Sequence, residues 1–301
     1  MKHLLSCEQY TRQSLEELFK LTDEILKNPK KYSGSLVGNL VSIIFYEPST
    51  RTRLSFESAV QRLGGTIIST ENAKVYSSAA KGETLEDTIK VISGYCDAIV
   101  IRHNEDDSSE RASKVSSVPI INAGAGKKEH PTQSLLDLYT IKQQKGRLDN
   151  IKLAVLGDLL YGRTIHSLVK LISLYDNISV YGLSKKEFAL PQKYIDYMNE
   201  RNVSYTICSS FDEIPSDVDV LYHTRTQYER FDGNTGREEF IINKEVLNKF
   251  SKETILLHPL PRNEEISTDV DEDPRALFFK QAHNGVPVRM AILLQCLDKS
   301  F

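Results

Sequence analysis

Short apolar runs rich in β-branched residues alternate with helix-length amphipathic stretches along almost the whole chain. This alternation is typical of parallel sheets whose strands are joined by crossover helices. We therefore expect an α/β fold in which each sheet is mostly parallel and flanked by helices. The expected strands are 40–45, 66–70, 97–102 and 118–122 in the first half, and 151–157, 178–183, 203–207, 218–222 and 254–257 in the second.

The length of 301 residues is about twice that of an ordinary single domain, so two domains are expected. Pro131 suits the first turn of a helix, and the helix that it opens, to about Lys145, is expected to join the two sheets. The first domain is predicted as residues 1–138, completed by a C-terminal helix over 284–301 that returns to it. The second is predicted as residues 139–283.

Three further helix ends can be predicted from local signals. Ser14 with Glu17 has the spacing of a capping box, and apolar residues then recur at helical spacing. Thr84 indicates a second helix start, because a threonine side chain can accept a hydrogen bond from the backbone three residues later. The last helix is expected from about Val286 to Leu297.

Composition narrows the class of protein. With 40% hydrophobic and 26% charged residues and a net charge of -3, nothing indicates nucleic acid or an anionic membrane as a partner. No apolar run approaches the roughly 18 residues of a membrane span. The four cysteines lack the spacing of a zinc site or disulfide framework, so a reducing, cytoplasmic location and no metal are expected. A processed organellar protein would look the same.

The segment 45–57 is the strongest candidate for a binding site. An expected strand runs into hydroxyl residues and arginines that open a helix. Free N–H groups and the positive end of the helix dipole attract an anion there, and Ser49, Thr50 and Thr52 add hydroxyl donors. Arg51 can bind two oxygens at once. A Ser-Thr pair at a helix start is more often an ordinary N-cap, but two closely spaced arginines favour a phosphate site.

The motif Ser49-Thr50-Arg51-Thr52-Arg53 resembles the carbamoyl-phosphate motif of the aspartate and ornithine carbamoyltransferases. Further stretches resemble that family in the same order and cover nearly the whole chain. They are Lys81-Gly82-Glu83-Thr84, Ile101-Arg102-His103, His130-Pro131-Thr132-Gln133, Gly157-Asp158 with Tyr161-Gly162-Arg163-Thr164, Thr224-Arg225-Thr226-Gln227 and His258-Pro259-Leu260-Pro261-Arg262. The resemblance implies carbamoyl transfer from carbamoyl phosphate, an early step of pyrimidine synthesis when aspartate is the acceptor, without a cofactor.

The resemblance implies that Thr52, Arg102 and His130 donate hydrogen bonds to the carbonyl oxygen of carbamoyl phosphate. Such donors stabilise the oxyanion of a tetrahedral intermediate by a few kcal/mol each, as an order of magnitude. It also implies that Gln133 and the backbone carbonyls of Leu260 and Pro261 hold the carbamoyl amide group. Considered alone, a histidine before a helix is more often a capping or core residue.

Arg163 and Arg225 each follow an expected strand of the second half, at the sheet edge where α/β proteins bind ligands. Two guanidinium groups suit a substrate with two carboxylates, so aspartate is expected rather than ornithine. Gln227 belongs to the same motif. Either arginine alone could equally be a surface ion-pair residue, and a carbamoyltransferase acting on another amino acid is the alternative.

Ser77 and Lys81 lie in a polar stretch of small residues that reads as a loop. The resemblance implies that this loop reaches the active site of a neighbouring subunit, so a homotrimer with shared sites is expected. A regulatory subunit is neither implied nor excluded. Glu47 and Arg230 are weaker candidates, for ion pairs with Arg163 and its neighbours.

Two other classes of protein compete with this interpretation. Residues 157–164 match a nucleotide-binding P-loop except for its lysine, but Leu159, Leu160 and Tyr161 are too bulky to wrap a triphosphate. A non-catalytic scaffold with the same fold is the second rival. One departure from the family pattern is Ala125, where an aspartate is common, and it leaves the conformation of the loop before His130 open.

Overall fold

The computed structural model describes residues 3–73, 81–226 and 240–299. The chain divides into two compact units, one formed by Met1–Gln133 with Gly285–Phe301 and the other by Ser134–Asn284. We call them the first and the second unit. Among the described residues, no helix has both the length and the apolar character needed to cross a bilayer.

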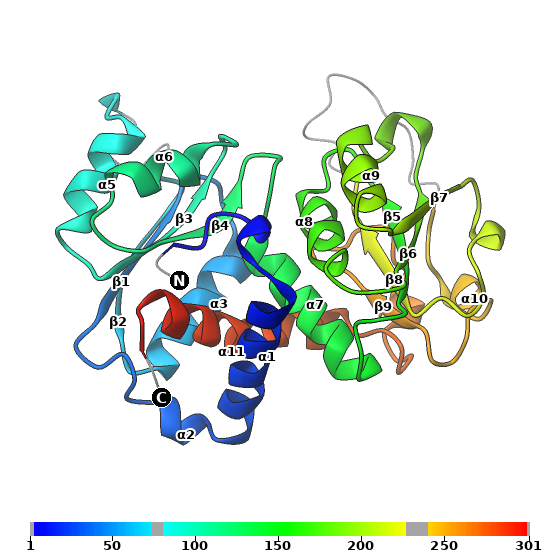
Figure 1. The fold of residues 1–301 in the computed structure, drawn as a ribbon, viewed down its shortest axis with the longest axis horizontal. Coiled ribbons are helices and arrows are strands. Elements are labelled where there is room, and N and C mark those ends of the chain that lie inside the picture. Colours follow the sequence, from blue (N-terminus) through cyan, green and yellow to red (C-terminus); the bar gives the residue numbers. More distant parts are fainter. Residues whose placement is uncertain (1–2, 74–80, 227–239, 300–301) are drawn as a thin grey trace. The chain divides into compact units, whose positions relative to one another are not determined.

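The sheet of the first unit has four parallel strands in the order β2-β1-β3-β4. The helices α5 and α6 pack together and lie on one face of this sheet, and α3 lies on the other (Figure 1). This division is the one that right-handed crossovers produce for this strand order. The elements are β1 Leu40–Phe45, α3 Thr50–Arg62, β2 Thr66–Glu71, α5 Leu85–Ser93, β3 Ala98–His103, α6 Ser108–Val115 and β4 Ile120–Ala125.

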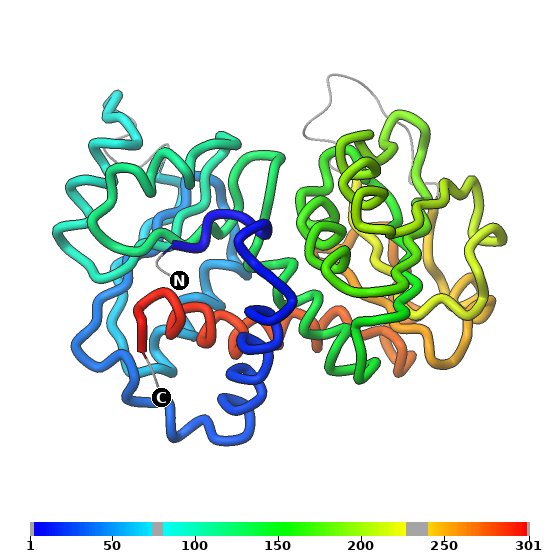
Figure 2. Tube along the Cα trace, in the orientation of Figure 1, coloured from blue at the N-terminus to red at the C-terminus, as the bar shows by residue number. Residues whose placement is uncertain are grey.

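The N-terminal segment extends this sheet. Leu4 forms a parallel bridge with Ile121 of β4, and the segment, blue in Figure 2, continues into η1, Cys7–Gln9. Then come α1, Arg12–Lys27, and α2, Pro29–Tyr32.

The predicted start of α1 was wrong by about one turn. Thr11, not Ser14, is the N-cap: its side chain accepts the N–H of Ser14, whose hydroxyl in turn accepts the N–H of Thr11. This reciprocal pair satisfies two backbone donors before the first apolar residue of the helix, so the helix begins earlier than the Ser14-Glu17 pair indicated.

The sheet of the second unit has five parallel strands in the order β7-β6-β5-β8-β9. The helices α8 and α9 pack on one face, and the short α10 lies on the other (Figure 1). The elements are β5 Lys152–Gly157, α8 Arg163–Ile172, β6 Ser179–Leu183, η3 Lys186–Phe188, α9 Gln192–Asn199, β7 Ser204–Cys208, η4 Phe211–Glu213, β8 Val220–Thr224, α10 Lys244–Leu247, β9 Ile255–Leu257 and η6 Thr268–Val270.

Two helices contribute residues to both units: α7, Pro131–Lys145, and α11, Phe278–Cys296. The prediction that the last helix starts near Val286 was wrong, because α11 begins eight residues earlier and runs through Pro287. Buried contacts hold these first two turns: Phe278 is fully buried, and Gln281 donates a hydrogen bond to Asp137. Tertiary packing therefore outweighs the local penalty of an internal proline.

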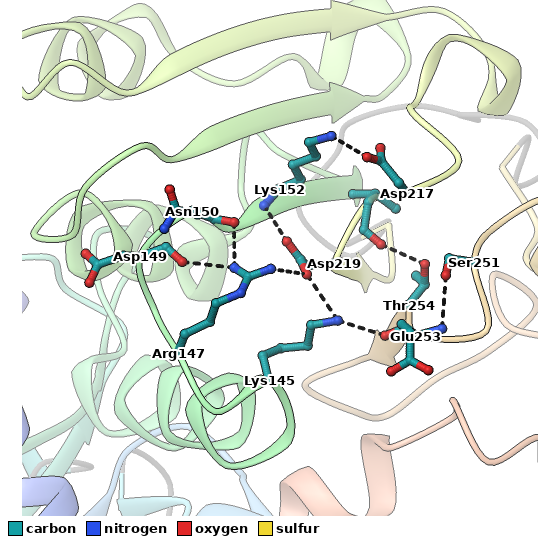
Figure 3. Close-up of polar contacts among 11 residues, drawn as sticks. Lys145, Arg147, Asp149, Asn150, Lys152, Asp217, Asp219, Ser251, Glu253 and Thr254 are labelled. Atoms are coloured by element: carbon teal, nitrogen blue, oxygen red, sulfur yellow. Dashed lines mark hydrogen bonds and ion pairs between the residues drawn. The ribbon is translucent and has the colours of Figure 1, made fainter.

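A network of charged residues fastens the second sheet where β5 and β8 begin (Figure 3). Asp219 accepts Lys145 and Arg147 at 3.1 and 2.8 Å and also the backbone N–H of Lys152 at 3.0 Å. Although burial alone would raise the pKa of Asp219, the backbone N–H of Lys152 and the two cations hold that pKa below its usual range. This network ties the end of α7 to the sheet within the second unit.

The expected fold class is confirmed: both sheets are parallel and flanked by helices. All nine predicted strands occur, with ends shifted by at most three residues. The starts at Thr84, which caps α5 by accepting the N–H of Asp87, and at Pro131 are also confirmed.

Candidate active site

Three neighbouring strands of the first unit deliver the predicted site residues to one edge of the sheet. Phe45, the last residue of β1, is in register with Arg102 of β3, and His103 is in register with Ala125 of β4. Because the strands are parallel, the segments that follow them leave the sheet at the same edge. These segments contain the start of α3 and His130.

The start of α3 has the features of an anion site. Ser49 is its N-cap, yet its side chain makes no capping hydrogen bond, and Thr50 and Arg51 are exposed. Thr52, in the same first turn, is only 6% exposed. The helix therefore offers N–H and hydroxyl donors and a nearby guanidinium group to an anion.

The two arginines of this segment have different roles. Arg53 lies 3.0 Å from Glu57 and 3.4 Å from Glu71, so two carboxylates compensate its charge along the flank of the helix. Glu71 also accepts the backbone N–H of Ser49. Arg51 is exposed in the first turn of the helix, which makes it the candidate for an anionic ligand, as expected from the sequence.

Arg102 is held from two sides. Its Nε lies 3.5 Å from Oε2 of Glu47, and one terminal nitrogen donates to the carbonyl of Ala123 at 3.5 Å. Glu47 was expected only as a partner of the region around Arg163, so this pairing was missed. The pairing could have been predicted from the position of Glu47, which lies two residues after the end of β1, the strand that pairs with β3.

His130 lies just before α7 and is only 5% exposed. Its Nδ1 is 3.5 Å from the hydroxyl of Thr132, and its carbonyl accepts the backbone N–H of Gln133. Gln133 itself is partly exposed. A buried imidazole at a helix start, with one ring nitrogen beside a hydroxyl, is constrained in orientation.

The loop before His130 keeps an ordered conformation with alanine at position 125. Ala125 and Glu129 form an antiparallel bridge, and Asp106 accepts the N–H of Lys127 at 2.7 Å. The buried carboxylate of Glu129 accepts the N–H of Cys7 at 2.9 Å. Sequence reasoning missed both carboxylates, because their partners are 21 and 122 residues away in the chain.

In the second unit, Arg163 and Arg225 follow adjacent strands. Gly157, which ends β5, is in register with Thr224, which ends β8, and Arg225 comes directly after it. Arg163 is the first residue of α8 and only 7% exposed, and Arg225 is partly exposed. Gly157 has φ +93°, and a Cβ there would come within 2.1 Å of the Thr224 carbonyl. Glycine thus permits the tight turn that leads toward Arg163.

The loop after β9 contains Leu260 and Pro261, the remaining site residues predicted in the second unit. Leu260 has a φ of +54° and precedes Pro261 with a cis peptide bond. His258, two residues earlier, is buried and accepts the N–H of Leu260 at its Nδ1. This loop follows the strand next to β8 at the same sheet edge.

The predictions on Ser77, Gln227 and Arg230 lie outside the described residues. Lys81 is exposed at the start of a described segment. Within the described ranges, no cluster of three or more His, Cys, Asp or Glu side chains is arranged to hold a metal ion.

The P-loop interpretation fits the structure poorly. The carboxylate of Asp158 accepts the N–H of Tyr161 at 2.8 Å, so a negative charge stands inside the loop that would have to bind phosphate. Leu159 is fully buried, and its carbonyl contacts His166 at 2.9 Å. The loop is therefore filled by its own side chains.

Two family models match the chain. The one described as "Aspartate/ornithine carbamoyltransferase, carbamoyl-P binding domain" matches residues 2–143. The one described as "Aspartate/ornithine carbamoyltransferase, Asp/Orn binding domain" matches residues 149–296.

Individual proteins give the same result. The aspartate carbamoyltransferase catalytic subunit of Clostridium novyi is 46% identical over 300 residues, covering 98% of this chain and 98% of that protein. The solved catalytic subunit of M. jannaschii aspartate transcarbamoylase has a TM-score of 0.92 at 46% identity and covers 99% of this chain and 98% of that one. Aspartate transcarbamoylase from Trypanosoma cruzi, solved with carbamoyl phosphate and aspartate, has a TM-score of 0.89 at 36% identity, covering 97% and 95%.

Proposed function

Because the chain belongs to the aspartate/ornithine carbamoyltransferase family, we propose that it transfers the carbamoyl group of carbamoyl phosphate to the amine of L-aspartate. The products are N-carbamoyl-L-aspartate and phosphate, and the reaction is an early step of pyrimidine synthesis. The observation that carries the proposal is the start of α3, where Arg51 and uncapped helix N–H groups offer donors to a phosphate beside a sheet edge that also holds Arg102 and His130.

The phosphate group is bound by the start of α3 in this proposal. Ser49, Thr50 and Thr52 supply hydroxyl donors, Arg51 supplies a bidentate guanidinium group, and the helix dipole adds a favourable field. The exposure of Thr50 and Arg51 supports this assignment, since an incoming ligand can reach both side chains.

The carbamoyl group is activated by donors rather than by a covalent nucleophile. Thr52, Arg102 and His130 donate to its carbonyl oxygen, where negative charge develops when the aspartate amine attacks the carbonyl carbon. Gln133 and the carbonyls of Leu260 and Pro261 hold its amide nitrogen. The bond from the carbonyl carbon to the phosphate oxygen then breaks, phosphate leaves, and the former amine loses a proton. Lys81 adds positive charge to this centre.

Aspartate is bound by the second unit. Arg163 and Arg225 pair with its two carboxylates, and Gln227 adds a polar contact. The adjacency of β5 and β8, which brings the two arginine-bearing segments to neighbouring strand ends, supports this pairing. Ornithine carries a second amine in place of the second carboxylate, and it would repel one of the arginines.

The assembly is proposed to be a homotrimer in which Ser77 and Lys81 complete the site of a neighbouring subunit. The exposure of Lys81 supports a role outside its own core. A cytoplasmic location is proposed because all four cysteines are free thiols, as expected in a reducing compartment.

A phosphate-release assay on the purified chain tests the function. We expect phosphate to appear only when carbamoyl phosphate and L-aspartate are both present, with L-ornithine giving little release. ATP hydrolysis without carbamoyl transfer would favour a nucleotide-binding protein. A folded chain that releases no phosphate would favour a scaffold.

A further inference from the structure

A buried histidine and a buried carboxylate lie at the two ends of the loop 258–265, which follows β9. Nε2 of His258 lies 2.9 Å from Oε1 of Glu265, and the two side chains are 1% and 2% exposed. Burial raises the pKa of Glu265, but the hydrogen bonds from His258 and from the backbone N–H of Asn263 outweigh it, so the pKa is lowered. Both residues belong to the second unit.

The hydrogen bonds define the protonation of this histidine. The backbone N–H of Leu260 donates to Nδ1 of His258 at 2.8 Å, so Nδ1 carries no proton. The ring proton is therefore on Nε2, which donates it to Glu265. Glu265 also accepts the N–H of Asn263 at 3.0 Å, which closes the loop 258–265 on itself.

Leu260 needs this support because of its backbone conformation. Its φ of +54° is unfavourable for a residue with a side chain, and such a residue persists only where its surroundings fix it. Its side chain packs against the apolar core of the second unit, and its N–H is held by His258. Together these two contacts hold the side chain of Leu260 and the peptide on its N-terminal side, which adjoins the acceptor carbonyl.

The support continues into the helices behind the loop. The backbone N–H of His258 donates to Gln281 of α11 at 2.9 Å, and the amide of Gln281 donates to Asp137 of α7 at 2.6 Å. Asp137 also accepts the hydroxyl of Tyr222 in β8 at 2.7 Å. Helix, strand and loop are thus joined by one buried chain of hydrogen bonds.

We propose that His258 and Glu265 are positioning residues that fix the Leu260 carbonyl as an acceptor for the carbamoyl amide group. This inference rests on the proposed function, which gives the Leu260 carbonyl that role. Glu265 selects the tautomer of His258 that can accept the Leu260 N–H. This hydrogen bond fixes the peptide on the N-terminal side of Leu260, next to the peptide that carries the acceptor carbonyl. Both side chains are shielded from solvent, so neither acts on the substrate directly.

Two substitutions of His258 distinguish this role from a general contribution to folding. His258→Asn retains an acceptor near the position of Nδ1, whereas His258→Gln places its polar group near the position of Nε2. We expect His258→Gln to lower kcat roughly 100-fold, the loss that a displacement of about 1 Å can cause. His258→Asn keeps an acceptor for the Leu260 N–H, so the loop should be displaced less. We expect its kcat to be at least about ten times that of His258→Gln.

The other readouts are the inhibition constant of inorganic phosphate and the melting temperature. Phosphate should bind each variant as it binds the wild type, because its proposed site is the start of α3. Glu265→Gln, which keeps an acceptor oxygen for His258, should stay within a few-fold of wild-type kcat.

Equal activities of folded His258→Asn and His258→Gln would overturn the inference, as would wild-type kcat in His258→Gln. If His258→Gln does not fold, kcat of His258→Asn decides: retention of a tenth or more supports the positioning role, and a 100-fold loss contradicts it. An inactive wild-type chain would instead refute the proposed function, so the two failures are distinguishable.

Discussion

Nε of Arg102 lies 3.5 Å from the carboxylate of Glu47, and these residues come from neighbouring parts of one sheet edge. The pair holds the guanidinium group of Arg102 before any substrate arrives. We expect Arg102→Ala to lower kcat by about 10²- to 10³-fold, the usual cost of removing one oxyanion donor. Steady-state kinetics at saturating substrates measure this. Glu47→Gln should reduce kcat less, because Arg102 remains, and an equally active Arg102→Ala enzyme would refute the role of Arg102.

Arg51→Ala should both raise KM for carbamoyl phosphate and lower kcat by orders of magnitude, because the bidentate contact with phosphate is lost. Arg62→Ala is the matched control. Arg62 lies in the last turn of the same helix and donates to Ser58 at 3.2 Å on an exposed face. Initial rates for both variants across a range of carbamoyl phosphate concentrations provide the comparison. Similar losses in the two would mean that Arg51 acts only through the helix.

Arg225→Ala should mainly raise KM for aspartate, since Arg225 is assigned to a carboxylate of that substrate. Removing a charged hydrogen bond costs about 1.5–3 kcal/mol, which corresponds to roughly a 10- to 150-fold increase. Arg201→Ala is a control in the same unit, because Arg201 stacks over Tyr197 at 3.6 Å. An unchanged KM for aspartate in Arg225→Ala would remove this residue from the site.

Lys81→Ala and Arg51→Ala chains should each be inactive alone and should regain part of the activity when mixed. In a trimer with shared sites, each site takes Arg51 from one subunit and Lys81 from a neighbouring subunit. Some sites of a mixed trimer therefore combine the intact Arg51 of the Lys81→Ala chain with the intact Lys81 of the Arg51→Ala chain. Unfolding and refolding the two variants together, followed by the phosphate-release assay, measures the recovery. Mixing without any recovery would count against sharing.

Asp219→Ala should lower the free energy of unfolding by about 3 kcal/mol, because it leaves Lys145 and Arg147 without a buried anionic partner. Asp217→Ala is the control: because its pair with Lys152 is exposed and screened by solvent, its loss should lower the free energy of unfolding much less. Urea unfolding of the two variants beside the wild type gives both values. A loss in Asp219→Ala no larger than that of the control would show that the network in Figure 3 contributes little.

The same aspartate gives a prediction for pH. The pKa of Asp219 is lowered in the folded protein. The ionised side chain therefore contributes its full stabilisation at pH values above the ordinary aspartate pKa, which is about 4. That contribution is lost as the pH falls through the depressed folded value. Wild-type stability should therefore decrease below about pH 4 more steeply than that of Asp219→Asn. Parallel acid dependence in the two proteins would contradict the assignment.

The strands could be predicted because each has a short apolar run of its own, such as 40–45, bounded by polar residues. Helix ends were less certain, because competing caps such as Thr11 and Ser14 lie within one turn of each other. The early start of α11 could not be predicted locally. It depends on a buried partner of Gln281, Asp137, that lies 144 residues away in the sequence.

The residues of the candidate site could be predicted from the sequence, but the buried hydrogen bonds that hold them in place could not. Arg51, Arg102 and Arg163 stand in local motifs, whereas Glu129 and the His258–Glu265 pair act through buried hydrogen bonds that no spacing reveals. Likewise, Arg163 and Arg225 follow neighbouring strands only because β5 pairs with β8 as well as with β6, the next strand in the sequence.

The fate of the carbamoyl carbon tests the central claim most directly. Carbamoyl phosphate labelled with ¹³C at that carbon would be incubated with the purified chain and L-aspartate, and the products followed by NMR. We predict that the label moves to the ureido carbon of N-carbamoyl-L-aspartate, with one phosphate released for each label transferred. Label that remains in carbamoyl phosphate, or that transfers to L-ornithine in preference to L-aspartate, would contradict the assignment.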